Sequence, residues 1–186
     1  MLAFFAAALA AAPAPASATP ATPSAATPAT PVLESAAPWW ERITVTVDDK
    51  GAQQSCRYET SASPGDAAVC DKAMAASIKP GNRSGATTGL YTKLTFERRF
   101  SPGNQLDAGR LQPGDTLLGR EVMFLTIDAK GSIQSCKVVA ATGEATPDYD
   151  CEDARKEQFR ATASAAPVAR QAFMTVLAYG HTELAA

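Results

Sequence analysis

A repeated segment that ends in a cysteine most constrains how this chain of 186 residues can fold. The stretch Val45–Cys56 returns as Leu125–Cys136, and both copies contain Asp-x-Lys-Gly followed by Gln-Ser-Cys. A second cysteine follows each copy, Cys70 in the first and Cys151 in the second, and no other cysteine occurs in the chain. The repeat and the cysteine framework are therefore one pattern, which predicts two related structural units.

Each copy begins with a pattern typical of a β-strand. Apolar and polar residues alternate over 43–48, which predicts a strand with one buried face, whereas Val122–Ile127 is almost continuously apolar, which favours a central strand. Gly51 and Gly131 then stand where a hairpin turn commonly needs a positive φ. We expect second strands at 53–59 and 133–140.

The second cysteine of each copy opens a helical pattern, and a closing strand follows. The first helix is expected from Val69 to Ile78, before Pro80-Gly81. In the second copy Asp150 is the expected N-cap, the acidic residues after Cys151 suit the positive end of the helix, and Phe159 lies on its inner face. The closing strands are expected at 90–97 and 173–179.

This order predicts an α+β fold made of two β-β-α-β units, each a small antiparallel sheet with one packed helix. The first unit is expected at 41–100 and the second at 121–186, joined by a linker at 101–120 that contains Gly and Pro.

Four cysteines allow three disulfide connectivities. Only pairing within each copy, Cys56 with Cys70 and Cys136 with Cys151, can be satisfied identically by both repeats. Closing a loop of about 15 residues stabilises a fold by about 3 kcal/mol, which is large for units this small. The wide spacing does not fit a thiolate zinc site or a redox Cys-x-x-Cys pair.

The N-terminal residues differ in composition from the rest of the chain. Residues 1–18 resemble a signal peptide: an apolar start, too short for the roughly 20 residues that span a bilayer, is followed by Ala16-Ser17-Ala18. No basic residue precedes Arg42, so an Ala-rich low-complexity tail is the alternative. Residues 19–40 are expected to be a disordered Pro/Ala/Thr-rich linker. With the disulfides, these features predict an exported, periplasmic protein.

No group of residues predicts catalysis, a cofactor or a metal. The net charge of −2 argues against binding of nucleic acid or of a membrane surface, and membrane association is expected only if the N-terminal segment stays uncleaved. The single histidine, His181, is expected to be solvated near the C-terminus. The acidic residues around Asp150 are explained by helix capping, and 81–85 by a turn rather than a phosphate loop.

The second copy is similar to the TonB C-terminal domain family, in the run Gly131–Gly143 followed by Asp150-Cys151. The first copy matches more loosely, in Gly51–Cys56 and Ser61–Cys70. The resemblance implies a strand, a glycine turn, a cysteine-bearing strand, a helix and a closing strand, twice. It also implies a context in envelope transport, in which the strand after the helix offers its edge to a partner.

We therefore expect a non-enzymatic binding or scaffold module that takes up a protein or extended peptide by strand addition. The expected partner-binding edges contain Leu90, Thr92, Lys93, Leu94 and Phe96 in the first copy, and Phe173, Thr175 and Leu177 in the second. In a purely structural alternative, the two units pair edge to edge and occupy these strands. A secreted enzyme or an inhibitor that presents the loop 101–119 is the second hypothesis.

Overall fold

The computed structural model describes residues 32–49, 52–62, 69–71, 91–145, 147–161 and 168–182. Its named elements are β1 (Val32–Leu33), β2 (Trp39–Val47), β3 (Gln53–Thr60), β4 (Lys93–Pro102), β5 (Asp115–Ile127), β6 (Ile133–Gly143), α2 (Cys151–Lys156), β7 (Gln158–Phe159) and β8 (Arg170–His181).

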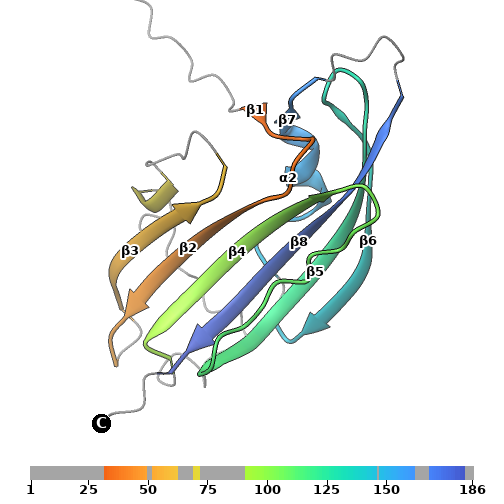
Figure 1. The fold of residues 1–186 in the computed structure, drawn as a ribbon. Coiled ribbons are helices and arrows are strands. Elements are labelled where there is room, and N and C mark those ends of the chain that lie inside the picture. The colour runs from red at the N-terminus through yellow and green to blue at the C-terminus, as the bar shows by residue number, and fades with distance from the viewer. Residues whose placement is uncertain are drawn as a thin grey trace, which may run out of the picture.

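The described residues form mainly one six-stranded antiparallel sheet, in the order β3-β2-β4-β8-β5-β6 (Figure 1). The expected α+β fold of two separate β-β-α-β units is therefore wrong. The two closing strands, β4 and β8, pair with each other from Lys93↔His181 to Pro102↔Ala172. Two small sheets would each leave a row of unpaired backbone N–H and C=O groups at this edge, and joining them satisfies both rows.

The repeat remains visible in the order of the strands. In each half the cysteine-bearing second strand lies outermost, the first strand lies next to it, and the closing strand lies at the centre. Helix is scarce: among the described residues only 69–71 and α2 are helical. The rest of the helix expected from Val69 to Ile78 lies outside the described residues.

Several expected boundaries also change. Phe159 belongs to β7 and not to the helix, which ends at Lys156. The linker expected at 101–120 is shorter, because β4 continues to Pro102 and β5 begins at Asp115. Part of the segment 19–40, which was expected to be a disordered linker, is ordered, because Val32–Leu33 is a strand and β2 begins at Trp39. The rest of that segment and the expected signal peptide lie outside the described residues.

The hydrophobic core lies on the face of the sheet that α2 covers, and it draws on both halves. Trp39 stacks on Phe100 with ring centroids 5.6 Å apart, and Phe100 lies 5.2 Å from Phe159. Met123 and Met174, from the second half, are fully buried in the same cluster. Because burying a large apolar side chain stabilises by about 1.5–3 kcal/mol, this shared cluster ties the two halves together.

Arg98 connects the sheet to the end of α2 on this face. Its guanidinium group lies 5.3 Å from the ring centroid of Trp39 and 4.6 Å from that of Tyr149. It forms ion pairs with Glu41, at 2.8 Å, and with Glu157, directly after α2. Burial raises the pKa of Glu157, although Arg98 opposes that shift. Buried charges require such partners, so this cluster positions the helix.

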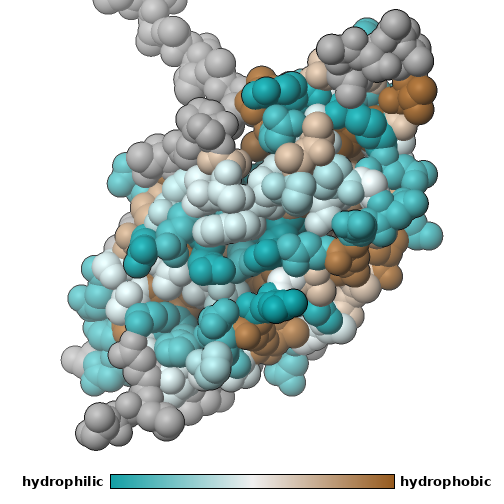
Figure 2. All heavy atoms as spheres, in the orientation of Figure 1, coloured by the Kyte–Doolittle hydropathy of each residue, from teal (hydrophilic) through white to brown (hydrophobic). Residues whose placement is uncertain are grey.

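The opposite face is crossed by the connection between β4 and β5 (Figure 1). Asp107 in this connection forms an ion pair with Arg99 of β4 at 2.7 Å. Figure 2 shows this face as mostly hydrophilic across its middle, with separate hydrophobic patches toward β5 and β6. The sheet is therefore covered by α2 and apolar contacts on one face and by a polar connection on the other.

No helix among the described residues is long and apolar enough to cross a membrane.

Candidate functional site

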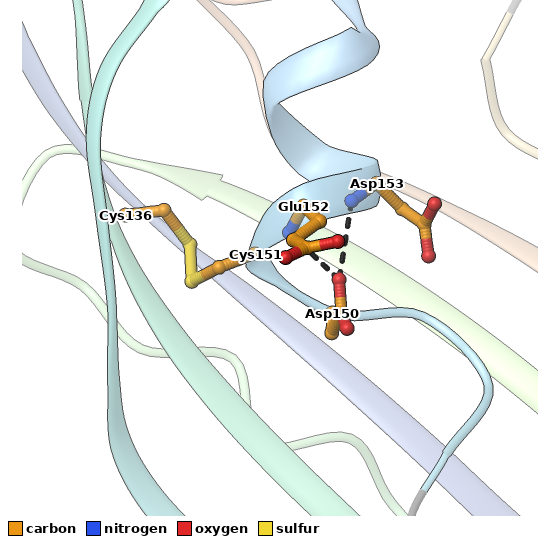
Figure 3. Close-up of a disulfide and its surroundings, with 5 residues drawn as sticks. All are labelled: Cys136, Asp150, Cys151, Glu152 and Asp153. Atoms are coloured by element: carbon orange, nitrogen blue, oxygen red, sulfur yellow. Dashed lines mark hydrogen bonds between the residues drawn. A yellow bond between two sulfur atoms is a disulfide. The ribbon is translucent and has the colours of Figure 1, made fainter.

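Both expected disulfides are present. Cys56 bonds to Cys70 and Cys136 bonds to Cys151, which confirms pairing within each copy. The second bond fastens β6 to the first residue of α2 (Figure 3). It constrains both the helix and the outer strand of the sheet.

The helix cap is also as expected. The carboxylate of Asp150 accepts hydrogen bonds from the backbone N–H groups of Glu152, at 2.7 Å, and Asp153, at 3.2 Å (Figure 3). This satisfies two N–H groups that have no partner inside the helix. No group of three or more metal-binding side chains occurs among the described residues. The Asp150 carboxylate therefore caps the helix, and the Asp153 carboxylate pairs with Lys156 at 2.7 Å.

The turn between β5 and β6 has the predicted positive φ at its glycine, with φ +91° at Gly131, whereas Gly51 lies outside the described residues. A Cβ at Gly131 would lie 1.8 Å from the carbonyl oxygen of Phe159. The turn therefore needs glycine both for its backbone conformation and for its close approach to β7.

The residues predicted to form a partner-binding edge lie at the centre of the sheet. Each of the two strands that hold them has a hydrogen-bonded neighbour on both sides. Within the pair, Phe96 is opposite Ala178 and Leu177 is opposite Glu97. The positions concerned are Lys93, Leu94 and Phe96 in β4, and Phe173, Thr175 and Leu177 in β8. Their backbones are therefore not available for strand addition, and the edge-to-edge alternative describes this region correctly.

Of the two remaining predicted edge positions, Thr92 lies directly before β4. Thr92 donates its backbone N–H to the carbonyl of His181 at 2.9 Å, which continues the ladder between β4 and β8. Leu90 lies outside the described residues.

Glu97 belongs to the closing strand that was expected to offer its edge to a partner, but its side chain is only 2% exposed. Its carboxylate lies 2.9 Å from Arg42, forms an ion pair with Arg99, and accepts a hydrogen bond from the Tyr179 hydroxyl at 3.0 Å. Burial and the neighbouring Glu97 carboxylate raise the pKa of Tyr179. Burial alone would raise the pKa of Asp107 too, but Arg99 holds it below its ordinary value. This cluster, Arg42–Glu97–Arg99–Asp107, fastens the β4–β5 connection to the sheet.

His181 is not the solvated residue that its place near the C-terminus suggested. It ends β8, and its Nδ1 lies 2.8 Å from the carboxylate of Asp115, whose side chain is 6% exposed. Gly114 is pressed against the ring, because a Cβ there would lie 2.9 Å from His181 Cε1. The pair fastens the start of β5 to the end of β8.

The open edges of the sheet are the strands that carry the first cysteine of each copy, β3 and β6. Their exposed side chains differ. Strand β3 presents the charged pair Arg57–Glu59, with a separation of 2.9 Å. Strand β6 is exposed from Lys137 to Gly143, and Lys137 is the only charged residue in this run.

The middle of β6 is apolar as well as exposed. Val138 is 42% exposed and Val139 is 49% exposed. The register shifts here, because Met123 pairs with Val138 and Val122 pairs with Ala140, which leaves Val139 as the extra residue of a bulge. Natural proteins usually protect a long apolar edge with charges, which are missing from 138–143.

A shallow depression of about 410 Å³ lies beside the turn that leads into β6, lined by Asp128, Ala129, Lys130, Gln134 and Ala169. The Asp128 carboxylate already accepts N–H groups from Lys130 and Ser132, each at 2.9 Å. These contacts stabilise the turn beside the depression, and they occupy the Asp128 carboxylate.

One sequence signal could have identified β6. The adjacent valines at 138 and 139 break the alternation expected of a strand with one buried face.

Comparison with protein-family models, with curated proteins and with solved structures found no match for this chain.

Proposed function

We propose that the protein is a non-enzymatic binding module that takes up an extended polypeptide segment by strand addition at β6. The observation that carries this proposal is the long, exposed and largely uncharged outer strand of the sheet. Main-chain hydrogen bonds to β6 would provide affinity, and the side chains of alternate residues would provide specificity.

The chemistry of β6 indicates what kind of segment it takes. The exposed Val138 and Val139 favour apolar, β-branched side chains opposite them, because cross-strand pairs of that kind stabilise a sheet. Proline is excluded from the paired positions, because it cannot donate to the ladder. The expected ligand is therefore an extended, weakly charged segment rich in Val, Ile and Thr.

The disulfide contributes rigidity to this edge. Because Cys136 is bonded to Cys151, part of β6 is held before any partner arrives. A preorganised strand loses less conformational entropy on binding, so more of the interaction free energy contributes to affinity. Two disulfides also suit an oxidising compartment, which supports export as part of the proposal.

We further propose a relation to the TonB C-terminal domain family and a role in envelope transport. The support is that the second half has, in this order along the chain, the strand, the cysteine-bearing strand, the helix and the closing strand that the resemblance implies.

A selection of decapeptides from a random library against the full chain tests the proposal. We expect the selected peptides to be rich in β-branched residues, to lack proline, and to bind Val139→Lys at least tenfold more weakly. Val139 is half exposed, so this variant should keep its fold. Ser55→Lys places the same charge on an exposed position of β3 and serves as the matched control.

If Ser55→Lys abolishes binding and Val139→Lys does not, the binding edge is β3 and the proposal is wrong. A selection that yields no binder dependent on Val139 also contradicts it.

A further inference from the structure

The segment that precedes the main sheet is itself an extended peptide. It is bound against Gln158–Arg160 and Arg170, which are called the slot below. This segment, Val32–Ser35, is called the strap below. It runs parallel to β7, with Val32 opposite Gln158 and Leu33 opposite Phe159. The backbone N–H of Arg160 donates to the carbonyl of Leu33 at 2.7 Å. The strap is thus added to β7 as a strand, in the only parallel pairing among the described residues.

The slot contacts the side chains of the strap as well as its backbone. Leu33 packs against the core cluster that contains Phe159. The Ser35 hydroxyl, on a residue 4% exposed, donates to the carbonyl of Arg160 at 2.9 Å and accepts from the Arg170 guanidinium. The Glu34 carboxylate lies 3.6 Å from Arg160. An apolar, an acidic and a hydroxyl-bearing residue therefore each have a defined place.

The slot is also held by hydrogen bonds in which the strap takes no part. The Arg170 guanidinium donates to the carbonyl of Arg160 at 3.0 Å, and the side-chain amide of Gln158 donates to the carbonyl of Lys130 at 2.8 Å. These bonds link the slot to the turn between β5 and β6 and to β8. The slot can therefore keep its shape when the strap leaves.

Only a short hinge joins the strap to the sheet. Ala36, Ala37 and Pro38 are exposed, and Trp39 then enters the core. The indole N–H of Trp39 donates to the carbonyl of Glu34 at 2.8 Å, so the indole reports directly on the position of the strap.

We propose that this slot, formed by Gln158–Arg160 and Arg170, is a second peptide-binding site that the chain's own strap occupies. It accepts in trans an extended segment with the pattern leucine, acidic residue, serine, in the direction parallel to β7. The site is independent of the β6 edge and binds a chemically different segment.

The tether decides when exchange occurs. A segment joined by a short linker competes at an effective concentration in the millimolar range. A free peptide at micromolar concentration therefore leaves the wild-type strap in place. It enters once the strap is weakened.

The experiment uses the full chain carrying Leu33→Asp, which removes the apolar anchor of the strap and leaves every residue of the slot unchanged. A synthetic peptide copying residues 30–37 is titrated while tryptophan fluorescence is recorded. We expect saturable binding to the variant and none to the wild type below millimolar peptide. A peptide with aspartate at the leucine position should bind at least tenfold more weakly.

A second variant, Ser35→Gly, keeps Leu33 and gives the same comparison if Leu33→Asp does not fold. Near-ultraviolet circular dichroism and mapping of the two disulfides check the fold. Folded variants that show no saturable binding, or that bind both peptides equally, overturn the proposal. Val139→Lys should leave this binding unchanged, so the test is separate from that of the β6 edge.

Discussion

The carboxylate of Glu97 lies at the centre of the polar face, almost fully buried between two arginines and a tyrosine. Charged groups are rarely buried unless they are paired, and removing one partner leaves the others uncompensated. Arg42 and Arg99 keep partial access to water, with 32% and 19% of their side chains exposed. The cost of losing Glu97 is therefore large but below that of a fully buried pair.

Replacing Glu97 by glutamine tests this cluster. We expect the free energy of unfolding to fall by about 2–4 kcal/mol, because two arginines lose the buried charge that compensates them. Glu59→Gln breaks an exposed pair with Arg57, whose side chain is 75% exposed, and should cost less than about 1 kcal/mol. Urea denaturation of both variants measures the difference, and equal costs would show that the cluster contributes no more than a surface pair.

Gly131 gives a second prediction at the scale of single residues. Gly131→Ala should destabilise the protein by about 3 kcal/mol or more, because it adds steric overlap with the Phe159 carbonyl to an unfavourable positive φ. Gly103 is the control: its φ is +75°, but a Cβ there would meet nothing within 4 Å. Gly103→Ala should cost only about 1–2 kcal/mol. Thermal or urea unfolding compares them, and similar losses would contradict the close approach.

These two residues also show what a sequence reveals at this scale. The positive φ of Gly131 could be predicted, because the local pattern Asp-x-Lys-Gly indicates a hairpin turn that needs glycine at this position. The burial of Glu97 could not be predicted, because it depends on the pairing of β4 with strands far along the chain. Taken alone, the charged residues Lys93 and Glu97 are typical of a strand that faces solvent.

Among the elements, the strap β1 depends on an acidic side chain. The Glu34 carboxylate accepts hydrogen bonds from the backbone N–H groups of Ala36, at 2.9 Å, and Ser35, at 2.8 Å. These bonds lower the pKa of Glu34, with a smaller contribution from Arg160. Ionised Glu34 therefore shapes the hinge that follows the strap.

The strap should accordingly loosen in acid. The pKa of Glu34 is lower in the folded protein than in the unfolded chain, where it is about 4.3. Ionised Glu34 therefore stabilises the fold at pH values above about 4.3, and this stabilisation is lost as the pH falls through the pKa of the folded protein. We expect amide exchange at 33–36, corrected for intrinsic rates, to accelerate as the pH falls below about 4. Glu34→Gln should show faster exchange at neutral pH and little further change. A strap equally protected in both proteins at every pH would refute this role.

The elements also differ in how far the sequence predicted them. The two disulfides, the cap at Asp150 and the strands around the repeated turns could be predicted, because each rests on a local pattern. The short β7 could not, since its strand character comes from pairing with Val32–Leu33 at the other end of the described chain. The helical pattern through Phe159 ended instead at Lys156.

At the scale of the whole molecule, the pairing of β4 with β8 decides which surfaces a partner can reach. The repeat predicted two separate units, which is wrong, because the closing strands of the two halves pair with each other in one sheet. That pairing joins residues far apart in the chain, so no local pattern could show it. The closing strands are therefore central, and the second strands, β3 and β6, lie at the open edges. The candidate binding site therefore moves from the strand that follows the helix to the strand that carries the first cysteine of the second copy.

Backbone amide hydrogen exchange, measured residue by residue with and without a peptide selected on the full chain, tests this arrangement most directly. In the free protein we predict slow exchange in β4 and β8, whose backbones are paired on both sides. Adding the peptide should slow exchange within Lys137–Gly143 and leave β3 and β4 unchanged. Fast exchange in β4 or β8 of the free protein, or protection that arises there when the peptide binds, would contradict the central pairing and the open β6 edge.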